Sequence, residues 1–195
     1  MLGLTGSIGM GKSTTAKLFA EEGIPVWDAD AAVHRLYAPG GKAVEHVLKL
    51  FPGVGSVETG IDRGKLAEAT IGHAEALGHL EAVVHPLVRE DQAAFVESQQ
   101  KAGADIVIFD IPLLAESGMA ALFHAVIVVT ADPAVRRERV LRRPGMTVAK
   151  LDGILARQAP EEDRLSLANY VVRTDGGMEP ARARVREILH ELRAS

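Results

Sequence analysis

Residues 6–13 read Gly6-Ser7-Ile8-Gly9-Met10-Gly11-Lys12-Ser13, which is the complete G-x-x-x-x-G-K-[ST] pattern of a phosphate-binding loop. The glycines allow a tight turn, so that successive backbone N–H groups point at phosphate oxygens. A helix that begins directly after such a loop adds unpaired N–H groups and the positive end of its dipole. The stretch therefore predicts a P-loop that holds a nucleoside triphosphate with Mg²⁺.

The residues of this loop have separate expected roles. We expect Lys12 to reach the β- and γ-phosphates, the Ser13 hydroxyl to ligate Mg²⁺, and Thr14 to contact the α-phosphate side. The alternative, a chance glycine-rich turn, is disfavoured by the strand pattern before the loop and the helical pattern after it. The same loop occurs in GTPases, ATPases and helicases, so it indicates the donor and not the acceptor. The predicted nucleotide-binding residues here are Ser7, Ile8, Gly9, Met10, Gly11, Lys12, Ser13 and Thr14.

Short apolar runs alternate with helical patterns along much of the chain, which is typical of buried parallel strands joined by crossover helices. Between the first two runs lies a helical pattern over Lys12–Glu22, followed by Gly23 where a helix commonly ends. We therefore predict the α/β class, as a three-layer α/β/α P-loop NTPase with a five-stranded parallel sheet. The predicted strands are Met1–Leu4, Ile24–Trp27, Ile106–Phe109, Ala125–Val129 and Tyr170–Val172.

Two regions interrupt this alternation. Residues 31–103 contain no convincing strand and are interpreted as a helical insertion, and residues 135–165 hold seven arginines in a helical hairpin broken by Pro144-Gly145. Setting both regions aside leaves a core of residues 1–30, 104–134 and 166–195. The helices predicted in the insertion are Ala31–Tyr37, Lys42–Leu50, Arg63–Thr70, Glu75–Val84 and Leu87–Ala102.

Composition excludes several classes of function. The sequence has no cysteine, which rules out disulfides, thiolate catalysis and cysteine-ligated zinc. A net charge of −4 gives no general attraction to nucleic acid or anionic membranes. The first residues lack a signal-peptide pattern, and no stretch is apolar for long enough to span a bilayer. We expect a cytoplasmic protein that acts on a small-molecule substrate, without nucleic-acid or membrane partners; the oligomeric state is not indicated.

Four segments in order resemble the dephospho-coenzyme A kinase family. Residues Gly3–Thr14 are close to that family's G-L-T-G-x-I-G-x-G-K-S-T, and Asp28-Ala29-Asp30 matches its D-A-D after the second strand. Leu80–Pro86 and Pro112–Glu116 resemble its L-E-x-I-x-H-P and P-L-L-F-E. The matches span residues 3 to 176, and near the end Gln158 and Arg164 stand at the family's Q and at the R of an R-L pair.

The resemblance implies transfer of the ATP γ-phosphate to the ribose 3′-hydroxyl of dephospho-CoA, which makes coenzyme A in the last step of its biosynthesis. It also implies a P-loop core, a helical CoA-binding domain and an arginine-bearing lid, and these correspond to the core, to residues 31–103 and to residues 135–165. One alternative is another small-molecule kinase, such as a nucleoside monophosphate kinase. A second is a nucleotide-dependent switch protein, although the N-K-x-D motif that a GTPase needs is absent from the sequence.

The candidate catalytic residues are Lys12, Asp30 and Arg139. Asp30 lies just beyond a predicted strand, where it would accept the proton of the acceptor hydroxyl; the alternative is an N-cap for the next helix. Arg139 and Arg143 would meet the phosphates from the lid, with surface ion pairs as the alternative. Here the match breaks, since the family's R-D pair corresponds to Arg143-Pro144.

The remaining candidate residues are expected to bind the metal ion, the acceptor or the adenine of the nucleotide. Asp110 ends the third strand pattern, where P-loop proteins place a carboxylate near Mg²⁺, so Ser13 and Asp110 form the predicted metal set. Backbone groups of Asp175 and Gly176 would serve the nucleotide, although Asn169 and Thr174 depart from the family pattern around them. The predicted acceptor-binding residues are Asp30, His85, Arg89, Leu113 and Leu114, each of which also has an ordinary packing or surface interpretation.

Overall fold

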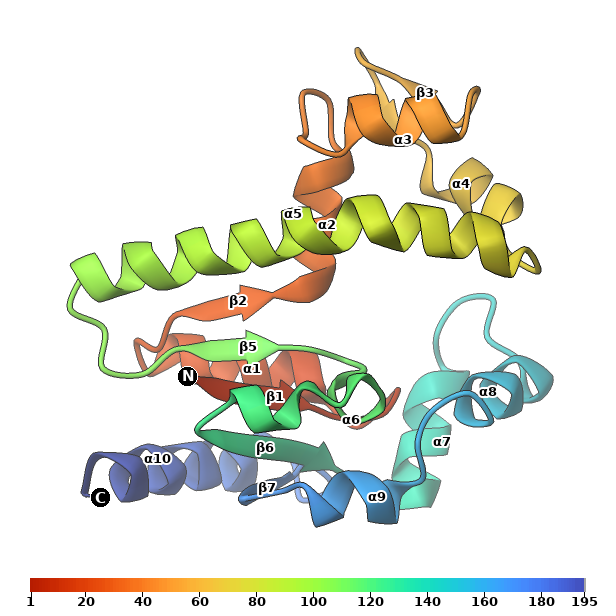
Figure 1. The fold of residues 1–195 in the computed structure, drawn as a ribbon. Helices are drawn as coiled ribbons and strands as arrows, with labels where there is room; N and C mark the ends of the chain where they lie inside the picture. The colour runs from red at the N-terminus through yellow and green to blue at the C-terminus, as the bar shows by residue number, and fades with distance from the viewer. Residues whose placement is uncertain (195) are drawn as a thin grey trace. The chain divides into compact units, whose positions relative to one another are not determined.

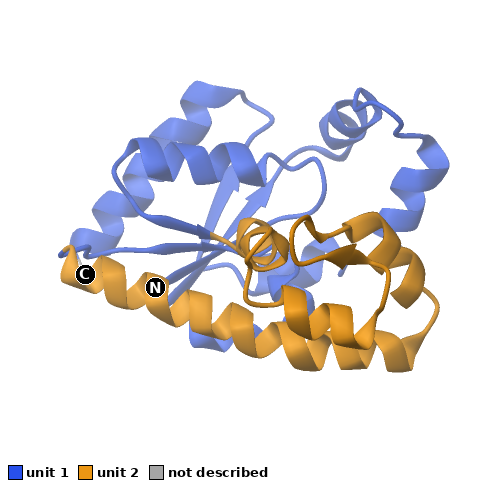
Figure 2. Ribbon diagram, turned by 90° about the horizontal axis from the view of Figure 1, so that it is seen from above, with its two compact units in different colours: residues 1–27, 103–195 blue, residues 28–102 orange. Residues whose placement is uncertain are grey.

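A computed structural model describes residues 1–194 and divides the chain into two compact units (Figure 2). The first unit contains residues 1–27 and 103–195, and the second contains residues 28–102. The first unit contains the P-loop sequence and one apolar core, and the second unit contains another apolar core. Each unit therefore has an internal architecture that can be described separately.

The first unit is built around a five-stranded sheet with the order β2-β5-β1-β6-β7 (Figure 1). The central strand β1 pairs in parallel with β5 and β6, placing Leu2 opposite both Ile108 and Ala125. All five predicted apolar runs form strands, which confirms the predicted α/β class with a five-stranded parallel sheet. The strands are β1 (Leu2–Thr5), β2 (Val26–Asp28), β5 (Ile108–Asp110), β6 (Ala125–Thr130) and β7 (Tyr170–Arg173).

Alternate residues of β1 face opposite sides of the sheet, as strand geometry requires. Leu2 and Leu4 join a core with residues of α1 (Lys12–Glu21) and α10 (Met178–Ala194). On the other face, a Cβ added at Gly3 would lie 2.7 Å from Leu114 Cδ2, so the glycine allows α6 (Leu114–Ser117) to approach closely. The 3₁₀ helix η1 (Met119–Leu122) follows α6. Helices thus pack against both faces of the sheet.

The arginine-rich region forms three short helices where the sequence predicts a hairpin. They are α7 (Pro133–Leu141), α8 (Val148–Leu155) and α9 (Glu161–Ser166). The predicted break is present, because Gly145 adopts φ 72° and Thr147 then caps α8 by accepting from the Lys150 N–H. A second break comes at Pro160, which precedes α9 and was not recognised in the sequence. Helices α7 and α8 thus form on either side of the predicted break, and α9 is an additional helix that was not predicted.

The second unit contains four helices and a small hairpin of its own, among its described residues. A buried cluster that includes Tyr37, Val47, Leu66 and Val84 forms its core. The hairpin of β3 and β4 was missed, because strands of two residues are too short to produce an alternating pattern. The elements are α2 (Ala29–Tyr37), α3 (Val44–Leu50), β3 (Gly55–Ser56), β4 (Gly60–Ile61), α4 (Arg63–Thr70) and α5 (Ala74–Lys101).

Helix α5 corrects a second prediction about this unit. The sequence predicts two helices separated near Pro86, but a single helix of 28 residues passes through that proline. Val84 lies in the buried cluster, and Leu87 and Val88 pack against it, so tertiary packing offsets the backbone hydrogen bond that proline cannot donate. Among the described residues no helix, α5 included, is both long and apolar enough to cross a membrane.

Candidate active site

The loop of residues 6–11 connects β1 to the N-terminus of α1. Gly9 and Gly11 adopt φ values of 78° and 89°, which are left-handed conformations that favour glycine. A side chain is also excluded at Gly9, where a Cβ would lie 2.4 Å from Val140 Cγ2 of α7. Gly11 caps α1 without a side-chain hydrogen bond. The first-turn N–H groups of α1 are therefore not occupied by a capping side chain, which is the arrangement that binds anions at helix N-termini.

Lys12 and Asp110 meet at one edge of the sheet. Asp110 ends β5, directly opposite Leu4 of the neighbouring strand β1, and Lys12 begins the helix that follows β1. The Lys12 ammonium donates to Asp110 Oδ1 and forms an ion pair with a carboxylate that is only 4% exposed. Two predicted site residues that are 98 positions apart are thus brought together.

The same edge supplies oxygen atoms that suit a hard cation. Ser13 is exposed in the first turn of α1, and the Asp110 carboxylate lies at the end of the adjacent strand. Mg²⁺ is typically held by one or two protein oxygen ligands, several waters and substrate phosphates. Ser13 and Asp110 therefore fit the ligand set that such an ion requires.

Arg139 contacts the loop after β7 through two hydrogen bonds. It donates to Thr174 Oγ1 at 2.8 Å and to the Thr174 carbonyl at 2.7 Å. The buried Thr174 hydroxyl in turn donates to the Met10 carbonyl at 2.7 Å. Thr174 thus connects Arg139 of α7 to Met10 of the P-loop. Sequence reasoning noted this residue only as a departure from the family pattern and missed the connection.

The adjacent residues of this loop are more exposed. Asp175 forms an ion pair with Arg173 at 3.2 Å, and the hydrogen bond from Arg173 is the main cause that lowers the pKa of Asp175. Gly176 follows it on the surface. Asn169, the other departure, accepts from the Val126 N–H at 2.8 Å and so stabilises the start of β7. The predicted nucleotide contacts of Asp175 and Gly176 stay predictions.

Gln158 was not proposed as a site residue, yet its side chain reaches the P-loop. Its Oε1 accepts from the Ser7 hydroxyl at 2.5 Å and from the Ile8 N–H at 3.3 Å. Close by, Glu116 accepts from the Ala159 N–H at 2.8 Å and lies 3.7 Å from the buried Arg164 guanidinium. Burial is the main cause that lowers the pKa of Arg164, while Glu116 opposes it. The segment after α8 is thereby fixed against the P-loop and α6.

Three other predicted residues of the first unit differ in their surroundings. Arg143 is exposed just after α7. Leu113 is 51% exposed, whereas Leu114 is fully buried near β1. Packing in the core thus accounts for Leu114 without a ligand, and its contact with an acceptor stays a prediction.

The candidates of the second unit lie on helix surfaces. Asp30 is exposed in the first turn of α2, but the helix is capped by Asp28, which accepts from the Ala31 N–H at 2.9 Å. The alternative interpretation of Asp30 as the N-cap is therefore wrong. His85 and Arg89 are exposed on α5, one helical turn apart. Their predicted contacts with an acceptor stay predictions.

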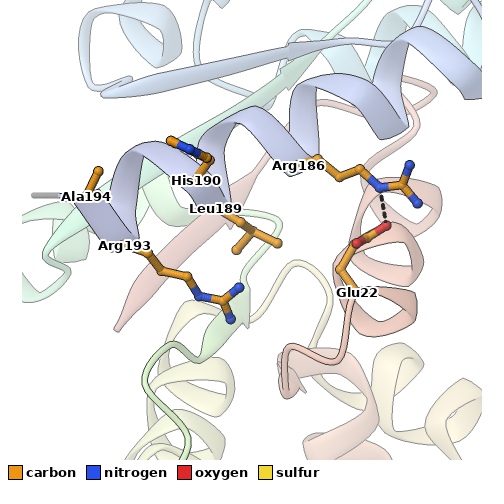
Figure 3. A pocket seen from close by; sticks show the side chains of 6 residues that line it. All are labelled: Glu22, Arg186, Leu189, His190, Arg193 and Ala194. Carbon is orange, nitrogen blue, oxygen red and sulfur yellow. Dashed lines mark hydrogen bonds and ion pairs between the residues drawn. The ribbon is translucent and has the colours of Figure 1, made fainter.

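A separate cavity of about 360 Å³ lies between α10 and the end of α1 (Figure 3). Two arginines line it, but each is bound to a carboxylate: Arg186 to Glu22 at 2.7 Å, and Arg193 to Asp105 at 2.8 Å. The hydrogen bond from Arg193 is also the main cause that lowers the pKa of Asp105. None of the predicted site residues lines this cavity, which is formed by Glu22, Arg186, Leu189, His190, Arg193 and Ala194.

Comparison with known proteins gives consistent matches over the chain. A family model described as dephospho-CoA kinase matches residues 1–179. A protein of Mesorhizobium japonicum named dephospho-CoA kinase is 52% identical over 99% of this chain and 96% of its own length. A crystal structure from Thermus thermophilus is 35% identical, with a TM-score of 0.83 over 98% of this chain and 96% of that one. A Campylobacter jejuni dephospho-CoA kinase has a TM-score of 0.67 at 21% identity over the same shares, a likeness of fold alone.

Proposed function

Since the chain belongs to the dephospho-CoA kinase family, we propose that it transfers the γ-phosphate of ATP to the ribose 3′-hydroxyl of dephospho-CoA. The products are ADP and coenzyme A, so the reaction is the last step of coenzyme A biosynthesis. The P-loop, held in its strand–loop–helix setting with Lys12 joined to Asp110, carries the donor half of the proposal. Family membership over nearly the whole chain carries the choice of acceptor. We place the protein in the cytoplasm, with a small molecule as its substrate.

The donor half of the reaction uses the first unit. The N–H groups of the loop from Ser7 to Gly11 and of Lys12, Ser13 and Thr14 bind the phosphates, and the Lys12 ammonium adds a positive charge beside them. Ser13 and Asp110 would hold Mg²⁺, which when bound neutralises charge on the β- and γ-phosphates. The ion pair of Lys12 with Asp110 supports this proposal, because it keeps a cation and a carboxylate side by side at the end of the loop.

The chemical step is an in-line displacement. The ribose 3′-oxygen attacks the γ-phosphorus while the bond from that phosphorus to the bridging oxygen of ADP breaks, and the Asp30 carboxylate accepts the hydroxyl proton. Arg139 and Arg143 offset the negative charge on the transferring group. Support for Asp30 comes from the capping role of Asp28, which leaves the Asp30 carboxylate exposed at the start of α2.

The acceptor half uses exposed residues with matching chemistry. Arg89 offers a guanidinium for an acceptor phosphate, His85 offers a polar ring, and Leu113 offers apolar surface for the pantetheine arm. Leu114 is fully buried beneath this surface region of the first unit. Backbone groups of Asp175 and Gly176 bind the adenine of ATP in this proposal.

An acceptor panel tests the proposed function. ADP release is measured with dephospho-CoA, AMP, CMP or no acceptor, at fixed ATP and Mg²⁺. We expect rapid release with dephospho-CoA only. Rapid release with AMP or CMP, but not dephospho-CoA, would instead identify a nucleoside monophosphate kinase. Release that is equally fast without any acceptor would identify a nucleotide-hydrolysing switch.

A further inference from the structure

Gln158 occupies hydrogen-bond donors that belong to the P-loop. Its amide oxygen accepts from the Ile8 N–H and from the hydroxyl of Ser7, which is 4% exposed. A backbone N–H can only donate, so the Ile8 contact fixes the orientation of the amide, with Oε1 toward the loop. Backbone N–H groups of a P-loop are also the groups that bind phosphate oxygens. The amide oxygen and a phosphate oxygen therefore compete for the same donors.

The backbone around Gln158 is held firmly, so the side chain is the adjustable part. The Gln158 N–H donates to the Leu155 carbonyl at 3.2 Å, at the end of α8. The next N–H, that of Ala159, donates to Glu116 at 2.8 Å, and Glu116 also neutralises the buried Arg164. These contacts fix the position from which the amide points at the loop.

The order of the loop indicates which phosphate lies near Gln158. Thr14 is expected at the α-phosphate side and Lys12 at the β- and γ-phosphates. Lower residue numbers in the loop therefore lie nearer the terminal phosphate. Continuing in this direction places Ser7 and Ile8 on the side of the terminal phosphate. This step rests on the proposed function of the loop as the ATP site.

We propose that Gln158 binds the terminal phosphate of ATP by rotating its amide group. In this rotation Oε1 moves away from the Ile8 N–H, which then donates to a phosphate oxygen. Nε2 takes the place of Oε1 beside the loop and also donates to the phosphate. The Ser7 hydroxyl remains a partner throughout, because it donates to Oε1 in one orientation and accepts from Nε2 in the other. A hydrogen bond to a charged phosphate is stronger than one between neutral groups, which favours the rotated form.

The isosteric variant Q158E tests this inference. Its carboxylate still accepts from Ile8 and Ser7, so the fold is preserved, but it cannot donate and it repels a phosphate. We expect the dissociation constant of a non-hydrolysable ATP analogue with Mg²⁺ to rise about tenfold or more, and that of ADP to rise less than about threefold. The variant Q158L removes the donor without adding charge, and we expect it to weaken the ATP analogue by a smaller factor and leave ADP unchanged.

The control Q100E makes the same change of charge on the exposed surface of α5, and it should leave both dissociation constants unchanged. Equal weakening of both nucleotides by Q158E, or no weakening of either, would overturn the proposal. If thermal unfolding shows that Q158E is misfolded, the same comparison of the two nucleotides with Q158L decides. The assay contains no acceptor, so a failure here is distinct from a failure to phosphorylate dephospho-CoA.

Discussion

The candidate residues of the two units differ in how many contacts their side chains make within the folded protein. In the first unit Lys12, Arg139 and Gln158 are held by specific partners, and Gly9 of the P-loop lies too close to Val140 to carry a side chain. In the second unit Asp30, His85 and Arg89 are exposed on helix surfaces. The candidate groups for the donor phosphates are therefore fixed by contacts within the folded protein, whereas the side chains proposed for the acceptor are exposed to solvent.

The largest effect expected from this comparison is that of Lys12→Ala. The substitution removes the charge beside the phosphates, and turnover should fall about 10³-fold. Asp110 also loses a cationic partner in a buried setting, so the midpoint of thermal unfolding should fall as well. The matched control is Lys17→Ala on the exposed face of α1, which should change neither quantity. Steady-state kinetics that show Lys12→Ala within tenfold of the unaltered protein would contradict this role.

The next largest effect separates two neighbouring carboxylates. Asp30→Asn should lower kcat by about 10² to 10⁴, because a general base is lost, while ATP affinity and stability remain unchanged. Asp28→Ala should do the reverse: it removes the N-cap of α2 and costs about 1 kcal/mol of stability, with kcat largely retained. Turnover assays and urea unfolding on both variants give the comparison. Near-normal turnover of Asp30→Asn would show that Asp30 is not the base.

A smaller effect is expected where the first unit departs from the family pattern. Thr174→Val removes the hydroxyl that bonds Met10 and Arg139, and leaves a buried carbonyl without that donor. We expect a loss of about 1–3 kcal/mol in the free energy of unfolding and a higher KM for ATP. Chemical denaturation measures the first quantity. A variant as stable as the unaltered protein would mean that the link from Arg139 to the P-loop has no energetic value.

The smallest effect is expected on the exposed surface of the second unit. Arg89→Ala should raise the KM for dephospho-CoA about two- to fivefold, as for one exposed charge contact, and leave the KM for ATP unchanged. Lys42→Ala breaks the exposed ion pair with Glu90 and serves as the control for charge loss in this unit. Equal changes in the KM for dephospho-CoA with both variants would show that Arg89 does not bind the acceptor directly.

The sequence predicted the sheet well because buried parallel strands leave continuous apolar runs, and β6 (Ala125–Thr130) is the clearest of them. It predicted α4 with both of its ends. It failed for the hairpin of β3 and β4, whose two-residue strands carry no periodicity, and for Pro86, whose breaking tendency is offset by packing on either side. Local sequence patterns therefore predicted the fold, but they missed features such as the β3–β4 hairpin and the continuous α5, which depend on tertiary contacts.

The same limit applies to the candidate site. Asp110 was predicted from its place at the end of a strand, since parallel strands bring their carboxyl ends to one edge. The contacts of Gln158 with Ser7, and of Thr174 with Met10, join residues 151 and 164 positions apart. Spacing in the sequence predicts neighbours only within one helix or one pair of strands. The three-dimensional structure was therefore needed to show that the segment after α8 and the loop after β7 contact the P-loop.

Position-specific analysis of the product tests the central claim most directly. The protein is incubated with dephospho-CoA, Mg²⁺ and ATP labelled in the γ-phosphate, and the labelled product is examined by mass spectrometry and phosphorus NMR. We predict that the label appears on the ribose 3′-oxygen, in a product identical to coenzyme A. Label found only in inorganic phosphate, or on another hydroxyl of the acceptor, would contradict the proposed function.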